Sequence, residues 1–487
     1  MTVLDEINKD YQYTQKTISI KRRLNSPDFA TDKYFDDNWL DITDYVLECD
    51  TITWNIDDVE VNEFTQGDFT LTLINRLQEF APETNSGSFF SGYLTRHRTK
   101  VKVTAGYIDS VTGTTYTYDV GVGLIDGTDI NAESDSTITV PCLSPSMIFD
   151  EQMAEDVYDG YIAGGVATST TSDRLIDATG VFDEFYVGYT VRNITTGEDT
   201  EVKEYVSATE LIVDRDIFSA GDTYDFNQQK KWWRSQTISQ LVQKIYDVQR
   251  KGKYLIHPFI DGATITPGND ITIPYADFTD LTCREALNKL AEVSNSCWYI
   301  DNNWFLIYKS RTPAGASVFT FTNQGLYANI LSASEYSDGL KKVLTRVSWK
   351  DSQPLVYAEE SAWEIGDNSS TWKYGNSKYE IENNFVSDRT IQKSICTSLL
   401  QEFVLPKEEI TLETKFIPHL SLLDKVTVNY VGVPAKSPGW FWNKSYWNKS
   451  YWTGRIGGIQ LNNRSMRIIK IEYDVNNWTC NFKVRGE

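Results

Sequence analysis

The sequence has few of the residues that hold metal ions or build disulfide frameworks. Its three histidines, His97, His257 and His419, are widely dispersed. No two cysteines form a CxxC motif, a spacing unlike that of a zinc ribbon or a disulfide scaffold. We therefore expect no metal site, and reduced cysteines that mostly lie in the core. The six are Cys49, Cys142, Cys283, Cys297, Cys396 and Cys480.

Long apolar runs and an excess of positive charge are also missing. No stretch approaches the ~18 apolar residues of a membrane helix, and residues 1–15 lack the charged start and apolar run of a signal peptide. We expect no membrane span, and folding in a reducing cytoplasm. Lys and Arg number 46 against 68 Asp and Glu, for a net charge of −22. Such a chain is repelled by phosphate, which argues against specific nucleic-acid binding.

Catalytic motifs are absent as well. The sequence has no P-loop, no dinucleotide-binding glycine fingerprint, no nucleophile elbow and no His-Glu zinc motif. Acidic pairs such as 57–58 and 359–360 fit solvated turns, although 68 acidic residues could place carboxylates together by chance. The acids between 173 and 184 do not have the spacing of an EF-hand loop. We expect no enzyme, no catalytic residues and no cofactor.

Aromatic residues are abundant, at 13% of the chain with 14 Trp and 28 Tyr. Large aromatic side chains suit pleated surfaces, and residues 51–56 and 69–74 alternate with period two. Helical spacing is confined to a few segments, among them one that starts at Thr282 with Glu285 as the partner of a capping box. The predicted fold is mainly β with an α+β module.

Changes of pattern along the chain predict four domains. Residues 1–155 form a first β-barrel with an N-terminal extension, and residues 156–230 a small inserted β-barrel. Residues 231–325 form a helix-containing middle domain of the α+β type. Residues 326–487 form a second β-barrel with one helix and an aromatic loop at 438–454.

The aromatic loop contains a repeat in which Trp-Asn-Lys-Ser-Tyr occurs twice in succession. A period of five places corresponding residues on opposite faces of a strand, so no single buried face explains the segment. Exposed Trp and Tyr could anchor a protein partner or stack on sugars, or could pack against neighbouring subunits or one another. The candidate contact residues are Trp442, Tyr446, Trp447, Tyr451 and Trp452.

Several short motifs follow one another along the chain. In the first barrel they lie at 18–23, 39–46, 69–75, 101–107, 123–126 and 138–144; the others lie at 216–224, 422–428, 466–473 and 478–484. Together, and in this order, they resemble bacteriophage tail-tip and baseplate hub proteins, although the Trp-Asn-Lys-Ser-Tyr repeat is not part of that family's pattern. We expect no peptidoglycan-cleaving or fibre-like domain after the second barrel.

The resemblance implies a homotrimer whose two hub-type barrels per subunit alternate in a pseudo-sixfold ring. Such a protein would be assembled in the host cytoplasm and reside at the tail tip of the virion. It would join the sixfold tail tube and distal tail to threefold tip proteins around the exit channel for DNA and tape-measure protein. We further expect part of the acidic excess to line that channel. The alternatives are a receptor- or glycan-binding tail protein and a glycan-degrading tail enzyme.

Overall fold

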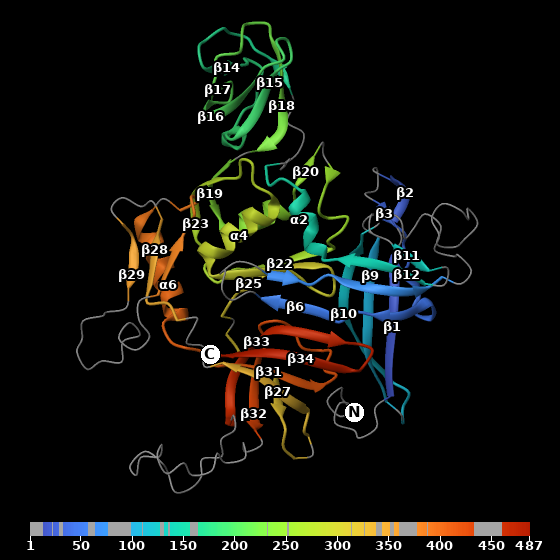
Figure 1. Cartoon of the computed structure of the whole chain (residues 1–487). Helices are drawn as coiled ribbons and strands as arrows, with labels where there is room; N and C mark the ends of the chain where they lie inside the picture. Colours follow the sequence, from blue (N-terminus) through green and yellow to red (C-terminus); the bar gives the residue numbers. More distant parts are fainter. Residues whose placement is uncertain are drawn as a thin grey trace, which may run out of the picture.

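The protein is mainly β, as the sequence predicts (Figure 1). Its described part holds two curled half-barrels, several smaller sheets and four α-helices. No helix in that part is long and apolar enough to cross a membrane. The computed structural model describes residues 13–21, 23–28, 33–56, 64–75, 99–109, 111–126, 131–134, 137–155, 164–230, 232–250, 253–312, 314–325, 327–337, 343–350, 355–359, 377–386, 388–432 and 460–487.

The first large sheet, called lobe 1 below, runs in the order β4-β1-β9-β10-β12-β8-β5, with β11 beside β12. Alternation builds it: Leu71 and Leu73 of β8 are buried, while Thr70 and Thr72 point to the half-exposed face. A two-stranded ribbon of β2 (Arg23–Asp28) and β3 (Lys33–Phe35) and the 3-10 turns η1 (Thr43–Tyr45) and η2 (Pro145–Met147) complete this part. The strands of lobe 1 are β1 (Tyr13–Lys21), β4 (Leu40–Asp41), β5 (Val46–Cys49), β8 (Phe69–Ile74), β9 (Lys100–Ile108), β10 (Thr115–Ile125), β11 (Asn131–Ser134) and β12 (Thr137–Leu143).

The second large sheet, called lobe 2, runs in the order β26-β32-β33-β34-β31-β27. In the chain, a smaller sheet and one helix lie between β27 and β31. The sheet consists of β28 (Arg346–Trp349), β29 (Tyr357–Glu359) and β30 (Lys378–Ile381), and it packs against helix α6 (Arg389–Phe403). The strands of lobe 2 are β26 (Phe319–Thr322), β27 (Ile330–Ser337), β31 (Glu409–Lys415), β32 (Lys425–Val431), β33 (Gln460–Asp474) and β34 (Thr479–Gly486).

The two lobes have the same strand order. If six strands of each lobe are numbered along the chain, both sheets read 1-4-5-6-3-2, with β1 and β26 as the first strands. All neighbours in both paths are antiparallel except β26 and β32, which are parallel where β1 and β9 are antiparallel. The chain thus contains one β topology twice.

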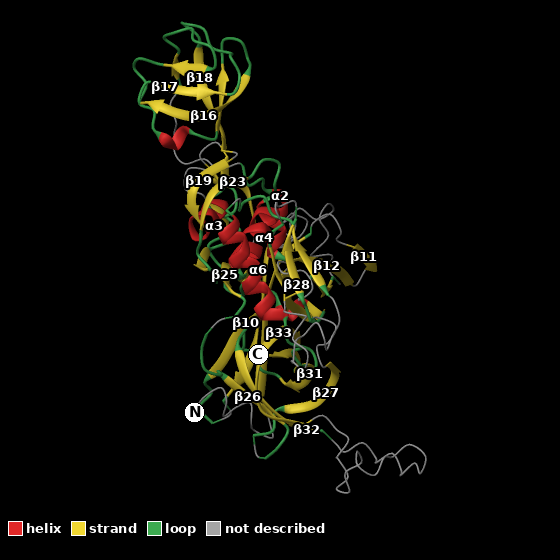
Figure 2. Ribbon diagram, turned by 90° about the vertical axis from the view of Figure 1, so that its left-hand side faces the viewer, coloured by secondary structure: helices red, strands yellow, loops and turns green. Residues whose placement is uncertain are grey.

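A middle module of helices and short sheets lies between the lobes and the insert (Figures 1 and 2). The predicted capping box between Thr282 and Glu285 is confirmed at α4, and α3 begins with a second capping box between Thr237 and Gln240. Asn295 ends α4 in the left-handed conformation. The helices are α2 (Ile148–Glu151), α3 (Ile238–Tyr246) and α4 (Cys283–Ser294); the strands are β19 (Trp232–Thr237), β20 (Gln249–Arg250), β21 (Lys253–Tyr254), β22 (Gly262–Thr266), β23 (Thr272–Asp277), β24 (Ser296–Ile300) and β25 (Phe305–Ser310).

The insert is a separate six-stranded β unit with its own hydrophobic core, seen at the top of Figure 1. Within that core the hydroxyl of Tyr224 donates a 2.7 Å hydrogen bond to Asp177, whose residue is 2% exposed. The unit consists of β13 (Gly165–Val166), β14 (Arg174–Ile176), η3 (Glu184–Tyr186), β15 (Tyr189–Asn193), β16 (Asp199–Ser207), β17 (Glu210–Val213) and β18 (Thr223–Lys230).

The Tyr224–Asp177 pair gives a test of the insert as an independent folding unit. Burial raises the pKa of Asp177, but hydrogen bonds from Tyr224, Thr179 and Gly180 outweigh it, so the pKa lies below its usual value. Tyr224→Phe removes a buried donor and should destabilise the insert by about 1–3 kcal/mol. Because the remaining core is separate, differential scanning calorimetry should show one transition shifted and the others unchanged. Tyr205→Phe, at a partly buried ring on the same core, is the control.

Candidate functional site: the junctions between the lobes

A strand from the lobe 1 part of the chain completes the sheet of lobe 2. Strand β6 (Ile52–Ile56), with β7 (Phe64–Gln66) on its other edge, follows β5 and pairs with residues 470–473 of β33. The first half of β33 pairs with β32, and β6 continues along the same edge where β32 has ended. The sequence pattern predicts a strand here but assigns it to the first barrel. In Figure 1, β6 lies directly beside β33.

Buried side chains reinforce this contact between the lobes. The indole Nε1 of Trp54, a residue 4% exposed, donates a 3.1 Å hydrogen bond to Val120 O in β10. The hydroxyl of Tyr107 donates to Phe416 O, so β9 is bonded to the loop after β31. Asn476 Nδ2, in the β33–β34 turn, donates to Cys49 O at 2.8 Å. The turn end of the β9–β10 hairpin therefore faces lobe 2.

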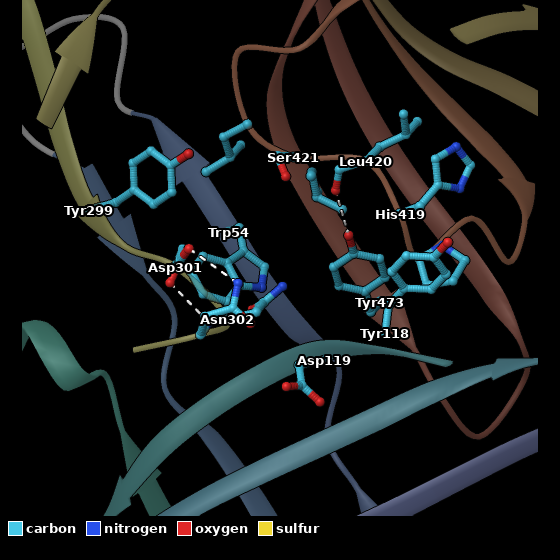
Figure 3. Close-up of a pocket in the computed structure, with 14 residues that line it drawn as sticks. Trp54, Tyr118, Asp119, Tyr299, Asp301, Asn302, His419, Leu420, Ser421 and Tyr473 are labelled. Atoms are coloured by element: carbon cyan, nitrogen blue, oxygen red, sulfur yellow. Dashed lines mark hydrogen bonds between the residues drawn. The ribbon is translucent and has the colours of Figure 1, made fainter. Parts of the chain in front are cut away.

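A pocket of about 170 Å³ opens where lobe 1, lobe 2 and the middle module meet. Trp54 and the Asp301–Asn302 turn lie toward one end, and Tyr118, Tyr473 and His419 gather at the other (Figure 3). The pocket is lined by Trp54, Tyr118, Asp119, Tyr299, Asp301, Asn302, Asn303, Pro418, His419, Leu420, Ser421, Leu422, Ile471 and Tyr473.

Hydrogen bonds in the pocket hold its own walls together. The carboxylate of Asp301 accepts from the backbone N–H groups of Asn303 and Phe305, at 2.9 and 2.8 Å. Asp119 accepts from Thr104 Oγ1 at 2.6 Å and lies 3.4 Å from the ammonium of Lys102. Both carboxylates thus fix local structure.

Burial shifts the pKa of three titratable groups in the pocket. Burial raises the pKa of Asp301 against the opposing effect of its hydrogen bonds. Burial lowers the pKa of His419, which favours a neutral imidazole at neutral pH. The hydroxyl of Tyr473 donates to Leu420 O at 3.1 Å, and burial raises its pKa far above the usual range. Aromatic side chains from three parts of the chain thus meet in the lining of the pocket.

The junction of lobe 1 with the middle module contains a buried cation. Lys100 of β9 is 2% exposed, and its Nζ lies 2.8 Å from Asp261 Oδ1, just before β22. The ammonium also lies 4.6 Å from the ring centroid of Trp304 and 5.2 Å from that of Phe35. Burial lowers the pKa of Lys100, and the carboxylate of Asp261 acts in the opposite direction.

The junction of the module with the smaller sheet of β28, β29 and β30 contains a buried acid. Glu292 of α4 is 5% exposed and accepts 3.2 Å hydrogen bonds from the hydroxyl of Tyr379 and from Asn383 Nδ2. Burial raises its pKa from 4.5 to about 7, although these two bonds and Lys289 lower it and Glu382 raises it further. A carboxyl group with a pKa of about 7 therefore joins α4 to the segment around β30.

The five residues predicted as contacts, Trp442, Tyr446, Trp447, Tyr451 and Trp452, lie outside the described residues. Their segment links the ends of β32 and β33, the same position that the β9–β10 turn has in lobe 1. The sequence pattern does not reveal the junction residues, because alternation shows that 52–56 is a strand but does not show which strand it pairs with. Within the described part of the chain, no group of three or more His, Cys, Asp or Glu is placed to hold a metal ion.

The equivalence of the lobes extends to individual residues. An extra residue interrupts the pairing of β10 before Gly121, and another interrupts β33 before Arg464. Four residues later, Ile125 pairs with Cys142 of β12, and Ile468 with Val484 of β34. The pairing of β12 with β8 and of β34 with β31 follows in the same register, which matches Leu71 to Leu412 and Val140 to Phe482.

No family model and no curated protein sequence matches this chain. Solved structures of phage tail proteins do. They include the prophage MuSo2 43 kDa tail protein from Shewanella oneidensis (12% identity, TM-score 0.45, covering 96% of each chain). The tail protein from Neisseria meningitidis MC58 shares 7% identity, with TM-score 0.45 over 98% of this chain and 97% of the other. Prophage tail protein gp18 from Listeria monocytogenes EGD-e shares 10%, with TM-score 0.45 over 97% and 94%.

These phage tail proteins thus match this chain over nearly its whole length. Identities of 7 to 12% do not carry a function from one protein to another.

Removing the counter-charge of Lys100 tests the first junction. Asp261→Asn should destabilise the main body by about 2 kcal/mol, less than a fully buried pair because Asp261 is half exposed. Lys100→Met, which keeps the apolar stem, should cost less than Asp261→Asn. Urea unfolding followed by tryptophan fluorescence measures both. Glu408→Gln, at the more exposed main-body pair with Arg464, should change stability by less than about 1 kcal/mol. An equal cost for Asp261→Asn and Glu408→Gln would contradict the structural role of Lys100.

Glu292 predicts a pH dependence of stability. Between pH 4.5 and about 7 the folded protein holds a proton that the unfolded chain has released, so the contribution of this group to stability falls as pH rises. Across this range the unchanged protein should lose about 3 kcal/mol of unfolding free energy, at roughly 1.4 kcal/mol per pKa unit. Glu292→Gln cannot titrate and should not show this loss. Unfolding free energies of both proteins at pH 5 and pH 8 measure it. The exposed Glu380→Gln is the control, and an unchanged slope in Glu292→Gln would disprove the assignment.

Proposed function

We propose that this chain is a non-enzymatic structural hub of a bacteriophage tail tip, acting as a trimer around the exit channel for DNA and tape-measure protein. It joins the sixfold tail tube to threefold tip proteins. The observation that carries this proposal is the single β topology present twice in one chain, with a bulge at corresponding places in β10 and β33.

Symmetry explains why such a duplication is useful at that position. A ring of three copies has threefold symmetry, and two equivalent lobes per copy give it six similar contact surfaces. One face can then match a sixfold partner while the rest of the molecule remains threefold. The rigid joint between the lobes supports this role, because a ring of alternating lobes requires a fixed angle between them.

The contact between lobes within the chain suggests the contact between copies. Within the chain, the turn end of β9 and β10 faces lobe 2. The corresponding end of lobe 2 is where β32 stops at Val431 and β33 begins at Gln460. We propose that the aromatic loop at 438–454, which joins these strands, contacts lobe 1 of the neighbouring copy. This position favours a partner contact over the alternative of glycan binding.

Oligomer mass tests both parts of this proposal. Native mass spectrometry of isolated tail tips should find three copies of the 55.6 kDa chain per tip. A triple variant with Trp442, Trp447 and Trp452 changed to Ser should fold but fail to enter the ring, because it loses the aromatic anchor. The control changes three exposed apolar residues elsewhere, Val181, Ile194 and Leu405, to Ser.

A copy number that is not a multiple of three would rule out the hub. Normal assembly of the tryptophan variant with three copies per tip would leave the hub in place and remove the contact assigned to the loop. Cell adhesion lost by that variant in assembled tails would favour the receptor-binding alternative.

A further inference from the structure

Two exposed leucines occupy corresponding positions in the two lobes. Leu47 of β5 is 53% exposed and Leu331 of β27 is 54% exposed. Each lies on the edge strand that ends its sheet path. Each is followed by an exposed polar residue, Glu48 or Ser332.

Both leucines are the extra residue of a β-bulge. In lobe 1, Val46 pairs with Leu73 and Glu48 with Thr72, so Leu47 has no partner across the strand pair. In lobe 2, Ile330 pairs with Thr414 and Ser332 with Glu413, which leaves Leu331 in the same situation. Bulges re-aim side chains, and here both turn a leucine outward on an edge.

The strand pairings on the far side of each sheet also match Leu47 to Leu331. Cys49 pairs with Leu71, and Ala333 pairs with Leu412. Leu71 and Leu412 are the residues that correspond through β12 and β34. The path around the sheet and the local bulge therefore both place Leu47 and Leu331 at the same point of the fold.

The contact between the lobes does not cover Leu47. Lobe 2 packs against lobe 1 within the chain, with Asn476 bonded to Cys49 O two residues from Leu47, and still leaves Leu47 exposed. If neighbouring copies use the equivalent contact, Leu331 remains exposed in the ring as well. Three copies then present six leucines in similar surroundings.

We propose that Leu47 and Leu331 are equivalent docking points for one ring of six identical protein subunits, each with an apolar recess that accepts a leucine. The inference rests on the threefold assembly proposed above and names the residues that meet the sixfold partner. A partner with threefold symmetry would need only three such points. A partner ring of six places the same recess opposite each lobe.

Cross-linking from single cysteines in assembled tail tips tests this inference. The six natural cysteines are buried, so a cysteine introduced at Leu47→Cys or Leu331→Cys is the accessible thiol among the described residues. A short thiol-reactive photo-cross-linker attached there should capture the same peptide of the same partner protein from both positions. Val111→Cys, 80% exposed at the β9–β10 turn, and Val181→Cys, 81% exposed in the insert, should not capture it.

The substitutions Leu47→Asp and Leu331→Asp should each lower the fraction of ring that carries the partner at least tenfold, while leaving three copies in the ring. Capture of different proteins from the two positions, or capture from one position alone, would overturn the inference. Three copies per tip in that same sample would show that the hub itself still stands. A different copy number would instead place the failure in the proposed assembly.

Discussion

The pairing of β6 with β33 is the interaction on which the rest of the structure depends. It completes the sheet of lobe 2 with a strand that directly follows the edge strand of lobe 1. Ile52, Trp54 and Ile56 are all buried there, and burial of each such side chain contributes roughly 1.5–3 kcal/mol. The ladder also fixes register. The lobes are therefore joined by backbone geometry as well as by side-chain packing, which sets the angle at which they repeat.

Buried polar groups at the other junctions act differently. Lys100 and Glu292 both lose their contacts with water on burial. A hydrogen bond to Asp261 replaces some of them for Lys100, and hydrogen bonds from Tyr379 and Asn383 do so for Glu292. Such groups add little net stability, but they penalise any arrangement in which their partners are displaced. The apolar contacts hold the module and the lobes together, and the polar contacts select one relative position.

Sequence reasoning reached the elements better than their partners. Alternation identified 69–74 and the closing hairpin, and the Thr282–Glu285 spacing identified the start of α4, because these signals are local. The pattern places the strand 52–56 in the first barrel, whereas it pairs with β33 of lobe 2, since period two gives the face of a strand and not its neighbour. The junction groups are long-range as well: Lys100 and Asp261 are 161 residues apart, and nothing in either segment marks the other. The aromatic loop at 438–454, predicted from its five-residue repeat, lies outside the described residues and stays a prediction.

The two lobes differ where their surroundings differ, which supports a duplicated scaffold over coincidence. Strand β26 comes directly from the middle module after β25 and runs parallel to β32, whereas β1 precedes that module and runs antiparallel to β9. The five remaining strands keep their order, their direction relative to one another and two bulges, one in β10 and β33 and one in β5 and β27, although residues as different as Leu73 and Thr414 occupy matching places. Shared topology without shared side chains is expected if backbone position is what assembly requires. A leucine that recurs at one exposed bulge is then the exception that calls for a functional reason.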